Sequence, residues 1–335
     1  MTLRTSFGIR TRLFGAFGAV AAMTVAASVA AWLSFANLSE SLGRIANTHV
    51  PAMTVAAQVA EKGGAIIATA PALMSAANEQ EQQAIWADLE ILLIDMSDLL
   101  EDMGGQLIDE PSRASLQRLI EGISDNLGAL NANVDNRFDL GNRNAELTER
   151  LRWLHADFLD EVEPMIEEAR FNIQSAMEDV EQPVGEEIGL AETKTLRAEM
   201  LKREALLKIN AAGNLAVGLL IRVASAENED EVEFSGHLIG DIAEGLSEDL
   251  GVLQGLASSV SLRQVVAEIL TLAVGSSSLL DVRKRELSVV QEGRRLLAAN
   301  NQLVDHLKTV IGARVSALES ATIAAAASSN RSIQS

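Results

Sequence analysis

The sequence lacks residue types on which whole classes of site depend. None of its 335 residues is Cys, which excludes disulfides, thiolate metal sites and cysteine nucleophiles. The sequence also contains no Tyr. Aromatic residues make up only 3% of the chain and there are five prolines, whereas 48% of the residues are apolar. This composition, dominated by Ala, Leu and Glu, is typical of long helices rather than of a sheet.

Basic residues are also scarce. There are 27 Lys and Arg against 47 Asp and Glu, and the net charge is −20. Arg4, Arg10 and Arg12 all precede the first acidic residue, Glu40. Nucleic-acid binding depends on Lys and Arg that neutralise phosphates, so we expect no nucleic-acid partner. We interpret the acidity of the body as a solvated helical surface.

One long segment near the N-terminus carries no charge. It extends from Leu13 to Ser39, and Leu13–Leu33 supplies the roughly 20 apolar residues that cross a bilayer core as a helix. The preceding arginines predict that residues 1–12 are cytoplasmic and that the body lies outside the cytoplasm. We predict an uncleaved transmembrane helix at residues 13–35; a signal peptide cleaved after Ala30 is the alternative.

The rest of the chain follows the helix period. Apolar residues recur in steps of three and four, and a second apolar row beside the first makes the buried face wider than the seam of a two-stranded coiled coil. This width favours four-helix bundles. Clear examples of the two rows near the C-terminus are Leu297, Val304, Ile311 and Leu318, flanked by Leu296, Leu303 and Val310.

An internal repeat divides this helical body. Ser75–Glu81 aligns with Ser225–Glu231 at an offset of 150 residues, with five of seven positions identical, and Gly105 falls on Gly255. Each repeat is expected to contain a long helix, two short helices and a second long helix. We therefore predict an all-α fold of tandem antiparallel four-helix-bundle units, residues 36–185 and 186–335. The sequence leaves open whether the two units exchange helices.

The motifs of catalysis are missing from the sequence. None of the four histidines lies in the Glu-x-x-His pattern of a di-metal bundle, and there is no glycine-rich phosphate loop or serine triad. Glu233, His237 and Asp241 share one helical face, which we interpret as solvated surface rather than as a metal site. We expect a non-enzymatic chain that has no cofactor, no metal and no phosphoacceptor histidine.

Two sequence blocks carry a resemblance to a known family. They are HVPAMTVAAQVAEKGGAIIATAPALMSAANEQE (His49–Glu81) and LLDVRKRELSVVQEGRRLLAANNQLVDHLKTVIGARV (Leu279–Val315). The first has an early proline and an Ala-x-Ala-Pro-x-Leu run, and the second has an Arg-rich entry into a Leu/Ala/Asn-rich helix. Both resemble the extracytoplasmic sensor region of TorS-type hybrid sensor histidine kinases, which respond to trimethylamine N-oxide.

The resemblance implies a function and partners. It implies a double helical bundle between two membrane helices, a homodimer in the inner membrane, and a TorT-like periplasmic binding protein that holds the small ligand. The kinase and receiver domains would belong to a longer protein, in which partner binding moves helices and signals across the membrane. Two alternatives remain: a chemoreceptor-type ectodomain that binds a small ligand directly, and an exported structural helical-bundle scaffold.

The candidate partner-binding residues lie around the repeated polar turn. Pro71 interrupts an apolar helix just before the first copy of the turn, which predicts a kink there, and the second repeat has Ile221 at that position. We expect the partner to contact this region, with candidates in both copies of the turn: Pro71, Asn78, Glu79, Asn228 and Glu229.

Overall fold

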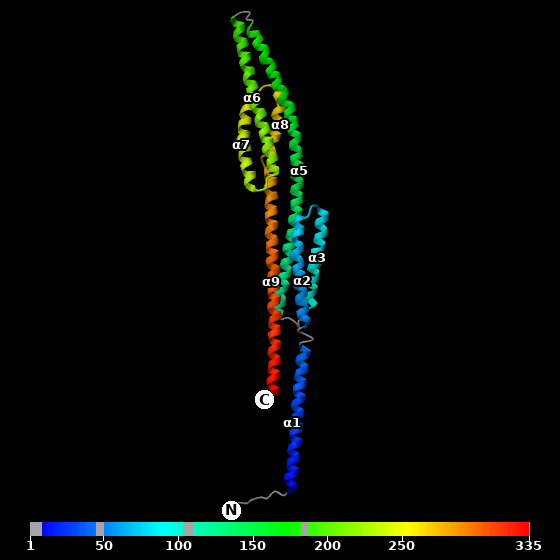
Figure 1. The fold of residues 1–335 in the computed structure, drawn as a ribbon. Coiled ribbons are helices and arrows are strands. Elements are labelled where there is room, and N and C mark those ends of the chain that lie inside the picture. Colours follow the sequence, from blue (N-terminus) through cyan, green and yellow to red (C-terminus); the bar gives the residue numbers. More distant parts are fainter. Residues whose placement is uncertain (1–8, 45–49, 103–109, 182–185, 335) are drawn as a thin grey trace, which may run out of the picture. The chain divides into compact units, whose positions relative to one another are not determined.

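The computed structural model describes residues 9–44, 50–102, 110–181 and 186–334. Over these ranges the chain forms eight α-helices and one short 3₁₀ helix, with no strand (Figure 1). The all-α prediction is therefore confirmed. The predicted glycine break at Gly104-Gly105 and the turn around Pro183 fall outside the described residues.

The chain separates into two compact units. Unit 1 comprises Met1–Leu130 together with Leu296–Ser335, and unit 2 comprises Asn131–Arg295. This division differs from the expected boundary between residues 185 and 186. The reason is that two long helices, α5 (Glu110–Glu181) and α9 (Leu279–Gln334), each contribute to both units. Each bundle is thus completed by a helix from the other repeat, a possibility that the sequence left open.

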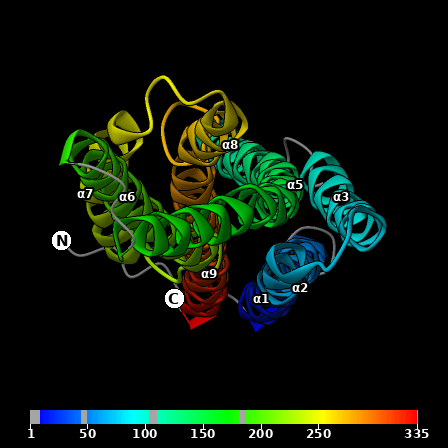
Figure 2. The same ribbon diagram turned by 90° about the horizontal axis from the view of Figure 1, so that it is seen from above.

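Unit 1 contains α1 (Ile9–Arg44), α2 (Val50–Ser75), α3 (Glu79–Asp102), the start of α5 and most of α9. The helices α2 and α3 form an antiparallel hairpin and lie side by side in both views (Figures 1 and 2). Apolar side chains spaced at three and four residues on α2, α3, α5 and α9 form the core of unit 1. Its most buried members include Ile66, Leu73, Leu89, Met96, Leu116, Ile123, Leu127, Leu130 and Val304.

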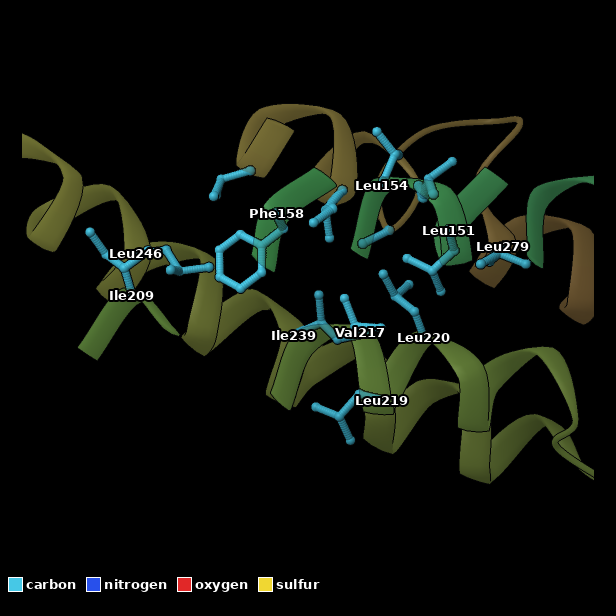
Figure 3. Close-up of a cluster of buried hydrophobic side chains, with 14 of the residues drawn as sticks. Leu151, Leu154, Phe158, Ile209, Val217, Leu219, Leu220, Ile239, Leu246 and Leu279 are labelled. Atoms are coloured by element: carbon cyan, nitrogen blue, oxygen red, sulfur yellow. The ribbon is translucent and has the colours of Figure 1, made fainter. Parts of the chain in front are cut away.

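Unit 2 contains the later part of α5, α6 (Glu186–Ala224), α7 (Glu229–Val252), η2 (Ala257–Ser259), α8 (Val260–Thr271) and the start of α9. Its α6 and α7 form the second hairpin (Figures 1 and 2). Leu151, Leu154 and Phe158 on α5 face Val217 and Leu220 on α6 in one continuous core (Figure 3).

The predicted repeat is visible in the helix boundaries. Both α3 and α7 have 24 residues, and Glu79 and Glu229, which begin them, are related by the same offset of 150 as the sequence repeat. The start of α8 at Val260 likewise matches the start of α5 at Glu110. The polar turn and the core positions thus repeat together, as expected of two copies of one supersecondary unit.

One part of the repeat prediction is wrong. The second repeat has a short α8, a break and then α9, as expected, but in the first repeat α5 runs for 72 residues without a break. The break contains Gly275 at φ 108°, a conformation that glycine adopts without a steric penalty. The equivalent residue, Asp125, lies inside α5, where the helix simply continues.

Candidate partner-binding surfaces

The tip of the α2–α3 hairpin is built around Asn78. Its side-chain Oδ1 accepts a hydrogen bond from the backbone N–H of Glu81 at 2.9 Å, and the Glu81 carboxylate accepts one from the N–H of Ala77 at 2.8 Å. This reciprocal pair resembles a capping box, except that the Glu81 carboxylate binds the N–H of the residue before the cap, and it satisfies backbone donors at the start of α3.

The α6–α7 tip repeats these hydrogen bonds at the 150-residue offset. Asn228 Oδ1 accepts from the N–H of Glu231 at 2.9 Å, and the Glu231 carboxylate accepts from the N–H of Glu227 at 3.3 Å. Asn78 and Asn228 therefore shape the two tips through their side chains. Glu79 and Glu229, the next residues, are exposed in the first turn of α3 and α7.

Pro71 is exposed and lies within α2, which continues to Ser75. The Ser75 hydroxyl donates to the Pro71 carbonyl at 3.3 Å and contacts the Ala72 carbonyl at 3.2 Å. Pro71, Asn78 and Glu79 thus belong to the tip in unit 1, whereas Asn228 and Glu229 belong to the equivalent tip in unit 2.

A buried polar cluster holds the tip in unit 2 to its bundle. The Arg283 guanidinium donates twice to the carbonyl of Ala226, at 2.9 and 2.6 Å, and also to the Glu286 carboxylate at 2.5 Å. Asn144 on α5 donates to the carbonyl of Ala224 at 2.9 Å. Sequence reasoning missed Arg283 and Asn144, because their partners are backbone carbonyls and leave no pattern in the sequence.

On the acidic and histidine face of α7, Glu233 pairs with a lysine of α9. The Glu233 carboxylate binds the Lys284 ammonium at 2.9 Å, and this hydrogen bond and charge lower the pKa of Glu233. Among the described residues there is no group of three or more potential metal ligands.

Two hollows are present in the described part of unit 1. One, of about 340 Å³, lies between α3 and α5, and the other, of about 310 Å³, lies between α2 and α3. Both linings mix acidic and basic side chains and contain no aromatic residue. They are Ser97, Leu100, Glu101, Arg113, Gln117, Ile120 and Glu121 in the first, and Gln58, Glu61, Lys62, Asp95, Asp98 and Leu99 in the second.

Two described segments are long and apolar enough to cross a membrane. Leu13–Ala36 in α1 has none of its span buried, whereas Thr193–Ala224 in α6 is 44% buried in its most apolar window. The first agrees with the predicted transmembrane helix at residues 13–35 in length and composition. The second is a core helix of unit 2 that still exposes much of its apolar surface.

Solved structures share this arrangement of helices. The TorS sensor domain in its complex with TorT, in the presence of TMAO, matches with a TM-score of 0.70 and 15% identity, over 79% of this chain and 98% of that chain. The V. parahaemolyticus histidine kinase sensor TorS sensor domain matches with a TM-score of 0.60 and 15% identity, over 78% and 97%. No protein-family model and no curated protein sequence matches the chain. The resemblance seen in the two sequence blocks is thus confirmed as a shared fold, and this chain has the fold of the TorS sensor domain.

Proposed function

We propose that the chain is the periplasmic sensor region of a two-component sensor histidine kinase and that it works with a periplasmic binding protein. The observation that carries this proposal is the fold match, which extends over 98% of a TorS sensor domain that was solved with TorT bound. A double bundle of this kind, without catalytic motifs, fits a protein that receives a partner rather than one that transforms a substrate.

The membrane placement rests on α1. Its uncharged segment Leu13–Ala36 leaves apolar side chains such as Phe14, Phe17 and Trp32 exposed, as a lipid-facing helix does. Arg10 and Arg12 before this segment favour a cytoplasmic N-terminus by the positive-inside rule, and the bundles would then lie in the periplasm. The protein then functions as a membrane-anchored homodimer.

The binding protein, rather than this chain, is proposed to hold the small ligand. The two hollows in unit 1 are polar, and both lie at the small end of the range of ligand pockets. Most residues with buried side chains in both units are apolar and closely packed, which leaves little room for a ligand.

The hairpin tips are the proposed contact surface for the binding protein. Pro71, Glu79 and Glu229 expose their side chains there, while the caps Asn78 and Asn228 fix the backbone that presents them. Docking at these tips would bias helix positions, and α9, unbroken from Leu279 to Gln334, is the element suited to carry a displacement toward the membrane.

Calorimetry on the full chain in detergent micelles tests the proposal. Titration with a TorT-like binding protein loaded with ligand is expected to release heat, whereas titration with the ligand alone is expected to release none. Direct binding of the ligand to the chain alone contradicts the proposal and favours the chemoreceptor alternative. Glu79→Ala and Glu229→Ala should weaken the binding-protein affinity, while Glu163→Ala on α5 serves as an exposed control.

The scaffold alternative is tested at the N-terminus. Mass spectrometry of the membrane fraction is expected to find an intact Met1. A chain that begins after Ala30 in the soluble fraction contradicts the anchored sensor and favours the exported scaffold.

A further inference from the structure

A buried amide without a partner lies on the inner face of α9 in unit 1. The side chain of Asn300 is completely buried, and among the described residues neither its Oδ1 nor its Nδ2 has a hydrogen-bond partner. Such a group costs stability, because its hydrogen bonds to water are lost on folding and are not replaced. Unit 1 therefore carries a local defect in the packing of α9.

The contacts on either side place Asn300 between α2 and α5. One turn before it, the carbonyl of Leu296 accepts a hydrogen bond from Nδ2 of Asn126 on α5 at 2.7 Å. One turn after it, Val304 lies so close to Gly63 on α2 that an added Cβ would be 2.9 Å from Cγ1. The residues that α2 and α5 bury next to these contacts are apolar: Ile66, Ile123 and Leu127.

The glycine contact identifies the matching position in unit 2. Gly213 on α6 lies against Phe158 on α5, just as the equivalent glycine on α2 lies against Val304 on α9. Phe158 and Val304 are 146 residues apart in the chain, and one turn earlier the same offset relates Leu154 to Asn300. Leu154 is buried in the core of unit 2. The repeated architecture thus accepts a leucine at this position and does not require an amide.

Two neighbouring positions differ in the same direction. At the glycine contact α9 has Val304 where α5 has the larger Phe158. At the preceding apolar position Leu297 is partly exposed, whereas its equivalent Leu151 is completely buried. A smaller or less enclosed side chain removes less apolar surface from water, so it stabilises its bundle less. Over these positions α9 in unit 1 is therefore held more weakly than α5 in unit 2.

We propose that the stretch of α9 around Asn300 is a weak point of unit 1, at which this helix shifts when the binding protein docks. Elements that move in signalling come from the less stable parts of a structure, and here the low stability has an identified cause. Packed helices shift by about 1–2 Å in such transitions. The inference rests on the proposed function for what starts the shift, whereas the weak point is a property of this chain alone.

Hydrogen exchange on the full chain in detergent micelles measures the weak point without a partner. After correction for intrinsic rates, the amides of Leu297–Ile311 on α9 are expected to exchange about tenfold faster than those of the equivalent stretch, Leu151–Met165 on α5. Asn300→Leu gives α9 the residue that unit 2 has, and it is expected to slow exchange in the α9 stretch about tenfold. Gln302→Leu, on the exposed face of α9, should leave the exchange rates unchanged.

The converse substitution is Leu154→Asn in unit 2. It is expected to speed exchange of the α5 stretch by about tenfold or more, because it buries an amide there without a partner. Equal exchange of the two natural stretches overturns the proposal, and so does faster exchange of α9 in Asn300→Leu. Asn300→Leu decides the result even when Leu154→Asn does not fold, since it removes a defect rather than creating one.

Spin labels measure the shift itself. Glu90→Cys on α3 and Asp305→Cys on α9 are exposed positions of unit 1, and the natural chain has no cysteine that would also be labelled. Labelled chains are diluted with unlabelled ones, so that the distance measured by pulsed electron paramagnetic resonance lies within one copy. The ligand-loaded TorT-like binding protein is expected to change this distance by about 1–2 Å. Asn300→Leu should at least halve the change, whereas Gln302→Leu should keep it.

Calorimetry on the same samples separates this inference from the proposed function. Binding without a distance change overturns the inference, as does binding with the same change in the natural chain and in Asn300→Leu. Absence of binding contradicts the proposed function and removes the trigger of the shift. The exchange rates then still confirm or overturn the weak point, because they are measured without the binding protein.

Discussion

Gly213 lies against the ring of Phe158 so closely that a Cβ on this glycine would be 2.3 Å from Cζ of the ring. The equivalent glycine of the first repeat, Gly63, lies similarly close to Val304, where a Cβ would be 2.9 Å from Cγ1. The two repeats thus use a glycine at the same position to bring a long helix against a core side chain, one from α5 and the other from α9.

The first prediction concerns these glycines. Gly213→Ala is expected to destabilise the protein by about 2–3 kcal/mol, because the rigid ring has no room to move in a closely packed core. Gly63→Ala should cost about 1 kcal/mol, since the Val304 methyl can shift by a rotation. Urea denaturation of the full chain in detergent measures both.

Gly240→Ala on α7 is the control for these two changes. Nothing lies within 4 Å of the added Cβ, so the variant should be as stable as the natural chain or more stable by about 0.5–1 kcal/mol. Equal effects of Gly213→Ala and Gly240→Ala would contradict the tight approach.

The second prediction concerns the two tips. Asn78→Ala and Asn228→Ala each remove a side-chain cap and should each cost about 1 kcal/mol. Because the two caps belong to different units, their effects should add in the double variant. Asn78→Asp and Asn228→Asp, which keep the acceptor oxygen, should retain most of the stability in thermal denaturation.

The third prediction concerns Arg283. Its side chain is only 17% exposed, and its two hydrogen bonds to Ala226 use the fork of the guanidinium. Arg283→Ala should cost about 2–3 kcal/mol, because the buried carbonyl of Ala226 loses its guanidinium donor and the Glu286 carboxylate loses its charged donor and keeps the amide of Asn144.

Arg283→Lys is the informative comparison. Lysine keeps the charge but not the fork, so it should recover less than half of the lost stability. Full recovery in urea denaturation would show that charge alone holds the tip. Hydrogen exchange at Ala224–Ala226 reports whether the loss is local to this tip.

The fourth prediction concerns Asn300 on α9. Its side chain is completely buried in unit 1, and among the described residues neither Oδ1 nor Nδ2 has a hydrogen-bond partner. Asn300→Leu should therefore stabilise the protein by about 1–2 kcal/mol, because it removes an amide that loses its hydrogen bonds to water on folding and gains none in return. Gln302→Leu, at an exposed position on the same helix, should change little. A loss of stability in Asn300→Leu would contradict this account.

The fifth prediction concerns pH. The pKa of Glu233 is lowered by its hydrogen bond to Lys284 and by the charge of that residue. A carboxyl whose pKa is lower in the folded state stabilises that state above its unfolded pKa, and this contribution disappears as the pH falls through the lowered value. An NMR titration should find that Lys284→Ala returns the pKa of Glu233 toward 4.5, its ordinary value.

Much of the fold was accessible from the sequence because it depends on local patterns. The turn SAANEQE and its copy SAENEDE predicted two equivalent tips, since the Asn and the Glu three residues later are the two halves of a capping box. The core positions followed from the heptad spacing, and Leu89, Met96 and Leu116 are indeed buried.

The remaining features depend on contacts between distant residues. The exchange of α5 and α9 between bundles was left open, because a heptad face does not specify which helix covers it. The continuity of α5 through Asp125 was not expected, since a repeat in sequence does not require the same break in both copies. No local sequence pattern marks Arg283, because its carbonyl acceptor is 57 residues away in the chain.

The way in which the units divide the sequence also sets the order in which they can fold. Unit 2 is one uninterrupted stretch, Asn131–Arg295, whereas unit 1 needs Leu296–Ser335 in addition to the N-terminal residues. During synthesis from the N-terminus, domains generally fold as units once their residues have emerged. The bundle that contains the first residues of the chain is therefore the last to be completed. Until α9 has been synthesised, α2 and α3 lack one of the helices that cover their apolar faces.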